Sequence, residues 1–221
     1  MSSLRMLLGD EQQLVLAGLR RLVEQIEGVD VVGETDSGRD MVAMARQARP
    51  ALVVMEVAMK ELNGIDAARQ IKEAVPGCKV LMLSAQASDA VVRAALKAGA
   101  SGILLKDAAP EELGRAIAAC LDGRVYLSPG LEQALLDDGQ EGAFDRLSPR
   151  QRQVLQLLAE GHSMREISGM LGVSIKTVET HRAAIMERLG VARLASLVLY
   201  AIREKLVNVP ELSLQHARGA Q

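Results

Sequence analysis

The chain has 221 residues, and its 26 basic and 28 acidic side chains give a formal net charge of −2. Hydrophobic residues make up 49% of the sequence, which excludes general disorder and allows one or two packed domains. Aromatic residues make up only 1%, which argues against a protein that stacks single-stranded bases or lines a sugar cleft with rings. Cys78 and Cys120 fit neither a zinc spacing nor a disulfide framework, so we expect a reducing cytoplasm. The sequence predicts neither a signal peptide nor a membrane span, and therefore no membrane partner.

Charge is distributed unevenly along the chain. Residues 1–130 carry a net charge of −2, residues 131–145 hold five acids and no base, and residues 146–209 carry a net charge of +5. A mildly acidic body, an acidic connector and a basic end predict two domains, the second of which lies near a polyanion. An ordinary solvated surface can carry the same basic excess, so charge alone leaves both interpretations open.

The first part of the chain alternates between short apolar runs and amphipathic stretches. The apolar runs, which predict strands, are Leu4–Leu8, Val29–Glu34, Ala51–Met55, Lys79–Leu83 and Gly102–Leu105. Continuous apolar runs are typical of strands that are buried on both faces of a parallel sheet. Helix signals lie between them, because Ser37 can cap the second helix and Pro110 falls in the first turn of the fifth. The pattern predicts an α/β domain with a (βα)5 doubly wound parallel sheet.

Polar side chains stand where four of these five strands end. They are Asp10 and Glu11, then Glu56, Ser84 and Lys106. Function gathers at the carboxyl ends of the strands in such sheets, so these side chains should meet in one shallow site. Carboxylates favour a hard cation such as Mg²⁺, while a hydroxyl and an ammonium suit an anion such as a phosphoryl group. The sequence therefore predicts a phosphoryl or magnesium site at this edge.

The segments that carry these residues resemble one family. LLGDEQ is similar to the acidic-pair motif of the receiver domain of bacterial two-component response regulators, and VVMEVAMKELNG to the segment that carries its phosphoacceptor. LMLSA is similar to the segment that carries the hydroxyl residue, and GASGILLKD to the segment that carries the lysine. The resemblance covers residues 4–124 and implies a receiver-like domain over residues 1–127 with the strand order 2-1-3-4-5.

The chain departs from the family pattern at three positions near the site. Glu56 stands where the resemblance implies the phosphoacceptor aspartate. Lys60 replaces a proline, and Ile103 replaces the aromatic switch residue. Asp10, Glu11, Ser84 and Lys106 keep the family's residue types.

The extra methylene of Glu56 moves the carboxylate ~1.5 Å further along the side chain. In-line phosphoryl transfer tolerates such misplacement poorly, whereas the longer side chain can itself reach Ser84 or Lys106. Lys60 can pair with the acids and displace Mg²⁺. No cofactor is therefore expected; if Mg²⁺ does bind, its ligands are Asp10, Glu11 and Glu56.

Four interpretations of Glu56 follow. It mimics the phosphorylated state and holds the domain on, or the site is degenerate and the domain is a dimerisation scaffold. Alternatively, Glu56 is itself phosphorylated, or the pocket senses another ligand.

The second part of the chain reads as helical and basic. A linker over residues 128–145 contains a possible short helix, Leu131–Leu136, and an acidic stretch. Ser148 and Gln151 form a predicted capping box that starts the first of four helices, and Ser174 caps the third. Two short helices joined across a glycine turn predict an all-α helix-turn-helix domain over residues 146–209. The tail over residues 210–221 is expected to be disordered.

The third of these helices is the candidate recognition helix. Its outward face carries Lys176, Glu179, Thr180 and Ala183, residue types that suit a major groove, although an ordinary amphipathic helix in a bundle is the alternative. Residues 146–206 resemble the LuxR/FixJ/NarL-type DNA-binding domain over LSPRQRQVLQLLAEGHSMREISGMLGVSIKTVETHRAAIMERLGV. The resemblance implies base contacts from Glu179, Thr180 and Ala183, and phosphate contacts from Lys176, Thr177, His181 and Arg182. Glu166 falls at the family's scaffold glutamate.

The last helix is the candidate dimer contact. Its apolar residues Leu194, Leu197, Val198 and Ala201 fit a buried pairing face, and Leu199 adds to the apolar run.

We therefore identify the chain as a member of the NarL/FixJ-type response regulators with an atypical receiver. We expect a cytoplasmic transcription factor, not an enzyme, that binds double-stranded promoter DNA as a homodimer independently of phosphorylation. A sensor kinase or RNA polymerase is a further expected partner. The alternatives are a phosphorylation- or ligand-switched regulator, and an interaction module that heterodimerises with another regulator and never reads DNA alone.

Overall fold

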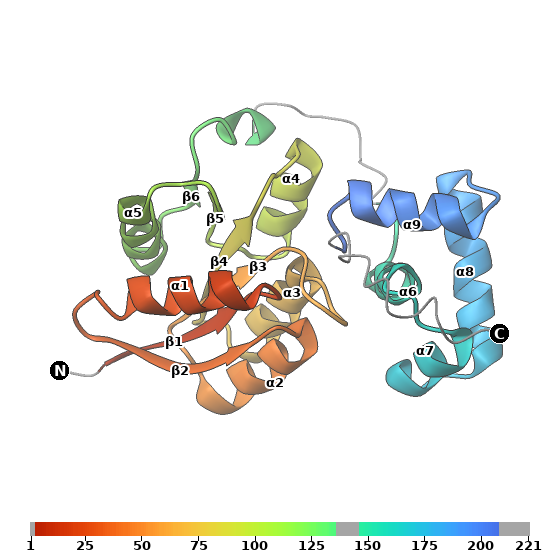
Figure 1. Cartoon of the computed structure of the whole chain (residues 1–221), viewed down its shortest axis with the longest axis horizontal. Coiled ribbons are helices and arrows are strands. Elements are labelled where there is room, and N and C mark those ends of the chain that lie inside the picture. The colour runs from red at the N-terminus through yellow and green to blue at the C-terminus, as the bar shows by residue number, and fades with distance from the viewer. Residues whose placement is uncertain (1–2, 136–145, 208–221) are drawn as a thin grey trace, which may run out of the picture.

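The structure is a computed structural model that describes residues 3–135 and 146–207. Its first domain contains β1 (Leu4–Gly9), α1 (Gln13–Val23), β2 (Val29–Thr35), α2 (Gly38–Ala48), β3 (Leu52–Glu56), α3 (Gly64–Ala74), β4 (Lys79–Ser84), α4 (Asp89–Lys97), β5 (Gly102–Leu105), α5 (Pro110–Leu121) and β6 (Tyr126–Leu127). A 3₁₀ helix (Glu132–Leu135) follows. The second domain contains α6 (Pro149–Ala159), α7 (Met164–Leu171), α8 (Ile175–Leu189) and α9 (Leu194–Arg203). This is the predicted α/β domain followed by an all-α domain, seen side by side in Figure 1.

The first domain is a doubly wound parallel sheet with the order β2-β1-β3-β4-β5-β6. The predicted order of the first five strands is confirmed. The two-residue strand β6, which the sequence did not predict, pairs in parallel with the edge of β5. Residues of α1 and α5 pack in one apolar cluster with one face of the sheet. Residues of α2, α3 and α4 pack in a second cluster with the other face.

Strand alternation explains the two layers. In β1, Met6 and Leu8 belong to the cluster on the α1 side, whereas Leu7 belongs to the opposite cluster. All three side chains are fully buried, as expected of a central strand in a parallel sheet. The helix starts follow the predicted signals, since the Ser37 hydroxyl accepts a hydrogen bond from the Asp40 amide and Pro110 begins α5.

The second domain is built on local capping. Ser148 and Gln151 form the predicted capping box at α6, and Ser163 and Glu166 form another at α7. Helix α7 ends at Gly172, whose backbone is left-handed, a conformation that glycine adopts without steric cost. Glu166 thus has a structural role, as the resemblance implied.

The two domains contact each other directly. In Figure 1, α6 lies beside the end of the receiver domain that carries α3, while α8 lies on the far side of the helical domain. Buried residues of α6 belong to the same apolar cluster as buried residues of α3 and α4.

The linker differs from its prediction in detail. The expected helix over Leu131–Leu136 is a 3₁₀ turn that ends at Leu135, and it packs against α4. The acidic stretch that follows and the tail over residues 210–221 lie outside the described residues. The boundaries of the domains at 127, 145 and 209 stay predictions.

Candidate functional site

The strand ends of the receiver domain bring the predicted pocket together. Asp10 directly follows β1, Glu56 ends β3 and Ser84 ends β4, while Lys106 follows β5. Asp10 is completely buried, and Glu56 and Ser84 are each 3% exposed. Glu11 lies beside Asp10 at the rim and is half-buried. The pocket is therefore a buried polar site within an otherwise apolar sheet edge.

Lys106 is the central charge of this pocket. Its Nζ lies 2.7 Å from Asp10 Oδ2 and 2.9 Å from Glu56 Oε1, and its side chain is only 13% exposed. The other Asp10 oxygen accepts a hydrogen bond from the Gln12 amide at 2.9 Å. One ammonium thus joins the two buried carboxylates, and Glu56 reaches Lys106, as its length predicted. Such a pair interacts strongly because burial reduces solvent screening.

Ser84, at the hydroxyl position, and Ile103, at the aromatic position, take no part in the ion pairs of the pocket. Ser84 Oγ donates to the carbonyl of Gln86 at 2.6 Å, so its hydroxyl is held by the β4–α4 loop. Ile103 is completely buried in the sheet core on the α3–α4 side. Because Ile103 is aliphatic, it has no hydroxyl or aromatic ring that could contact the β4–α4 loop. It contributes only to the packing of the sheet core.

Lys60 does not pair with the pocket acids, which corrects the expectation from the sequence. Its Nζ contacts Asp36 Oδ2 at 2.6 Å. The hydrogen bond that Lys60 donates to the Asp36 carboxylate raises the pKa of Lys60, and the charge of Glu11 adds to the effect. The backbone explains the choice of partner, because the Lys60 amide also donates to the Asp36 carbonyl and holds the two segments together.

In this arrangement, two of the pocket carboxylates that a divalent cation would use are already paired with Lys106. The carboxylate oxygens that a divalent cation would take, Asp10 Oδ2 and Glu56 Oε1, both lie within 2.9 Å of the Lys106 ammonium. In the part of the chain that the structure describes, no group of three or more His, Cys, Asp or Glu side chains is placed to hold a metal ion.

The candidate recognition helix α8 presents the predicted residues on an accessible face. Lys176, Glu179, Thr180 and Ala183 are exposed in the whole chain, so the receiver domain does not cover them. The half-buried residues of the set are Thr177, His181 and Arg182. Val178 and Ile185 are completely buried and fix the opposite face to the domain core.

Two of the four predicted dimer residues are in the wrong place for that role. Leu197 and Ala201 on α9 are completely buried in the core of the helical domain, because α9 packs its inner face on α6. They cannot pair with a second copy while the domain is folded. Leu194 is 48% exposed, Leu199 is 68% exposed and Val198 is half-buried, so the outer face of α9 is apolar and accessible.

Sequence reasoning missed a polar contact between the domains. Arg152 on α6 makes a two-point ion pair with Asp66 on α3, with Nε at 3.0 Å from Oδ2, and the two side chains are 5% and 3% exposed. Gln156 Nε2 donates to the Met59 carbonyl at 2.7 Å, and its Oε1 accepts from the Asn63 amide at 2.7 Å. We call these residues the domain contact. The sequence did contain a signal for this contact. Arg152 and Gln156 fall on the same inward face of the helix as the apolar residues Val154, Leu155 and Leu158.

The chain matches two protein families over most of its length. Residues 6–118 match the response regulator receiver domain, and residues 145–201 match the bacterial regulatory proteins of the luxR family. The transcriptional regulatory protein MctR of Rhizobium johnstonii is 34% identical over 93% of this chain and 96% of its own. The response regulator UvrY of Escherichia coli K12 is 33% identical over 96% of this chain and 100% of its own.

Solved structures agree with the sequence relatives. A structure of two RcsB dimers bound to two parallel DNAs has a TM-score of 0.58 at 29% identity, covering 92% of this chain and 99% of that one.

Within the described residues, no helix is both long enough and apolar enough to cross a membrane.

Proposed function

Because this chain belongs to the response regulators that carry a luxR-type DNA-binding domain, we propose that it binds promoter DNA as a homodimer without a phosphoryl group on Glu56. MctR is a transcriptional regulatory protein and UvrY is a response regulator, so the proposed function is regulation of transcription rather than catalysis. We place it in the cytoplasm, where promoter DNA lies, with RNA polymerase as the downstream partner. A sensor kinase is not required. The observation that carries the proposal is the position of the Lys106 ammonium between Asp10 and Glu56.

In the ion pair, Glu56 supplies the negative partner of Lys106 that a phosphoryl group would otherwise supply. A negative oxygen at the end of the longer side chain holds Lys106 at 2.9 Å. A phosphoryl group on Glu56 would have to take the place of the carboxylate oxygen that now contacts Lys106. The pocket is therefore held in one state by its own residues.

The docked domains leave the recognition helix accessible. The domain contact uses α6, whereas the predicted base-facing residues Glu179, Thr180 and Ala183 lie exposed on α8. DNA binding therefore needs no separation of the domains. The outer face of α9, with exposed Leu194 and Leu199, supplies an apolar surface for a second copy. Paired recognition helices would then read half-sites about one helical turn apart.

The central test compares wild type with Glu56→Ala and Glu56→Asp at one stated salt concentration. We expect wild type to be dimeric in sedimentation and bound to genomic promoter fragments. Glu56→Ala should bind at least tenfold more weakly, because Lys106 loses one of its two anchors. The matched control is Glu73→Ala, which removes an exposed carboxylate on α3 and should change nothing. Equal binding by all variants would show that Glu56 has no part in controlling DNA binding. It would refute the proposal that Glu56 takes the place of a phosphoryl group.

Phosphorylation is tested separately with labelled acetyl phosphate and Mg²⁺. Wild type should remain unlabelled, whereas Glu56→Asp restores the shorter carboxylate of the family and can accept label. A label on wild type that disappears in Glu56→Ala would refute phosphorylation independence.

The DNA-binding face is tested by Lys176→Ala and Arg182→Ala. Each lost phosphate contact should reduce the slope of log K against log salt by about 0.9. The control is Arg46→Ala, an equal charge change on the exposed surface of the receiver domain. Unchanged DNA binding in both α8 variants would favour the heterodimerising interaction module instead.

A further inference from the structure

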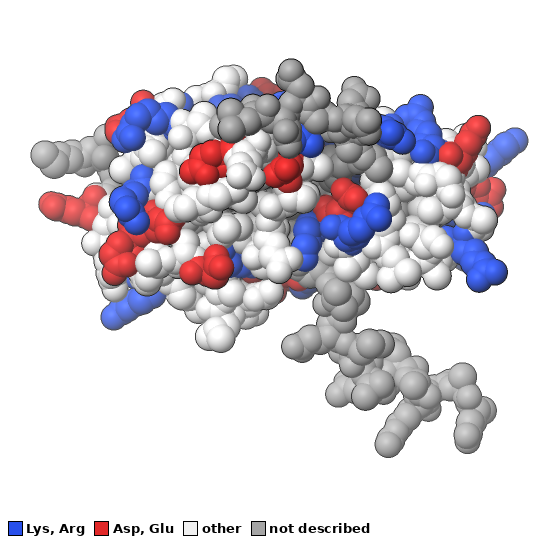
Figure 2. All heavy atoms as spheres, turned by 90° about the horizontal axis from the view of Figure 1, so that it is seen from above, with Lys and Arg blue, Asp and Glu red and all other residues white. Residues whose placement is uncertain are grey.

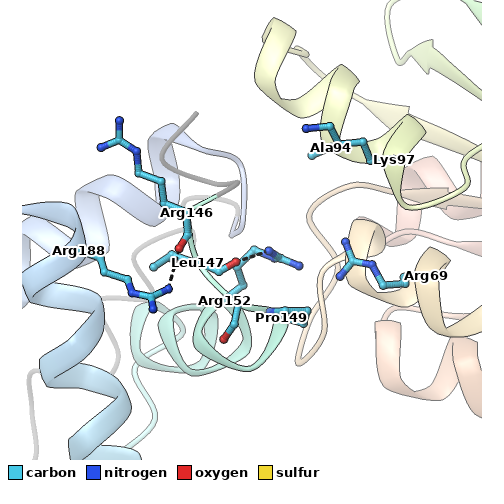
Figure 3. A pocket seen from close by; sticks show the side chains of 9 residues that line it. Arg69, Ala94, Lys97, Arg146, Leu147, Pro149, Arg152 and Arg188 are labelled. Atoms are coloured by element: carbon cyan, nitrogen blue, oxygen red, sulfur yellow. Dashed lines mark hydrogen bonds between the residues drawn. The ribbon is translucent and has the colours of Figure 1, made fainter. Parts of the chain in front are cut away.

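A cavity of about 510 Å³ lies where the two domains meet. Arg69 on α3 and Lys97 on α4 form its receiver wall. Arg146, Arg152 and Arg188 form the helical wall, and Figure 3 shows the Arg152 side chain pointing across the cavity toward Arg69. The volume falls within the range of about 300–1,000 Å³ that is typical of small-molecule sites.

The cavity concentrates positive charge. Asp66 pairs with both Arg69, at 3.0 Å, and Arg152, so two guanidinium groups share one carboxylate. Arg188 Nη1 donates to two neutral acceptors, the Arg146 carbonyl at 2.9 Å and Gln151 Oε1 at 3.1 Å. These bonds hold its guanidinium in place but leave its charge without neutralisation by either partner. In the view from above, Lys and Arg atoms near the middle of the face lie beside Asp and Glu atoms (Figure 2).

The chemistry of the walls selects a phosphate-bearing ligand. Arginine presents planar donor groups that match phosphate oxygens, often two at a time. The N-terminus of α6 also opens into the cavity at Ser148 and Pro149, and a helix N-terminus adds positive potential. Cations on two facing walls can each engage a separate phosphate of one ligand. We propose that this cavity binds a small phosphorylated anion with two or more phosphate groups, which bridges the receiver and helical domains.

The proposed site is distinct from the DNA-binding face. The predicted DNA contacts occupy α8 from Lys176 to Ala183, whereas the cavity meets the same helix near its end, at Arg188. A ligand held there touches both domains and the helix that reads DNA. Occupancy therefore favours the docked arrangement and couples a soluble metabolite to the DNA-binding domain. This goes beyond the proposed function, and its test uses no DNA.

The test is calorimetric titration of the full chain with inorganic tripolyphosphate, and in a second arm with ATP, both without Mg²⁺ and at one stated salt concentration. We expect one site per chain. Lys97→Gln and Arg146→Gln remove one cation from each wall, and both residues are exposed, so folding is not at risk. Each variant should bind about tenfold more weakly, the effect of one lost charge-assisted contact.

Two control variants locate the binding. Arg46→Gln removes an exposed cation from α2, and Lys176→Gln removes one from the DNA-binding face, so neither should change the affinity. Tighter binding of ATP than of tripolyphosphate, lost in the wall variants, supports a nucleotide ligand, and equal binding supports an inorganic one. Absence of binding, affinity unchanged in the wall variants, or an equal loss in Lys176→Gln would overturn the proposal.

Discussion

The ion pair between Arg152 and Asp66 makes a quantitative prediction about how firmly the domains are docked. Replacing Arg152 by Met keeps much of the apolar stem of the side chain but removes the guanidinium. Asp66 would then remain in a site where it is 3% exposed. The substitution should leave the sheet and the helical core intact and weaken the domain contact selectively.

The expected loss of docking free energy depends on which partners Asp66 keeps when Arg152 is replaced. Removing one partner of a buried ion pair costs roughly 3–5 kcal/mol when the other charge is left alone. Asp66 is not left alone, since Arg69 stays at 3.0 Å and Asn63 Nδ2 donates to it at 2.9 Å. Arg69 is partly exposed and therefore screened, so it compensates incompletely. We expect docking to lose about 2–3 kcal/mol.

Two backbone amides report on docking directly. The Asn63 amide donates to Gln156 Oε1, and the Glu61 amide donates to Glu160 Oε1, so each is protected across the domain boundary. In native-state hydrogen exchange, Arg152→Met should reduce their protection by about 30- to 150-fold, the equivalent of 2–3 kcal/mol. The amides of β3 serve as an internal control, because they pair within the sheet and should exchange as in wild type.

A double-mutant cycle completes the experiment. Asp66→Asn together with Arg152→Met should cost less than the sum of the two single changes, with a coupling of about 1.5–3 kcal/mol. Unchanged protection of the Asn63 amide, or a coupling below about 0.5 kcal/mol, would show that the ion pair does not hold the domains together.

Four further predictions concern packing and ionisation. A Cβ on Gly64 would lie 2.2 Å from the carbonyl that ends β3, so Gly64→Ala should lower stability to urea by about 1–3 kcal/mol. Gly114→Ala on α5, where a Cβ meets nothing within 4 Å, should instead raise it by about 0.5–1 kcal/mol. Burial raises the pKa of the Cys78 and Cys120 thiols to about 11, so both should resist iodoacetamide at pH 8 until the chain unfolds; rapid alkylation of the native protein would contradict this. Burial also raises the pKa of Glu160 above 4.5, so its ionised form is disfavoured in the folded state and stability falls as pH rises through the folded pKa. Unfolding midpoints of wild type and Glu160→Gln should therefore diverge as pH rises from 4.5, and a constant difference would refute this.

Local signals predicted most of the fold. The capping boxes and the strand ends depend on residues a few positions apart, so Ser148 with Gln151 could be recognised from the sequence. The same holds for the pocket, because carboxyl ends of parallel strands must meet at one edge. Strand β6 was missed because two residues carry no periodicity and depend on the free edge of β5.

Long-range pairings could not be predicted in the same way. Lys60 was expected among the pocket acids, but the backbone bonds that bring it to Asp36 join separate loops. Leu197 and Leu199 are both apolar, and only the packing of α9 on α6 decides which of them is buried. Arg152 and Asp66 are 86 positions apart, so no local pattern links them.

The loop between β3 and α3 has a consequence for protein engineering. The same seven residues that leave Glu56 at the end of β3 carry the Met59 carbonyl and the Asn63 amide to Gln156. A chimaera that joins this receiver to another luxR-type domain would therefore need an Arg and a Gln at the positions of Arg152 and Gln156. Without them, the transplanted domain would lose the ion pair to Asp66 and the two hydrogen bonds to this loop, and it would dock less firmly beside Glu56.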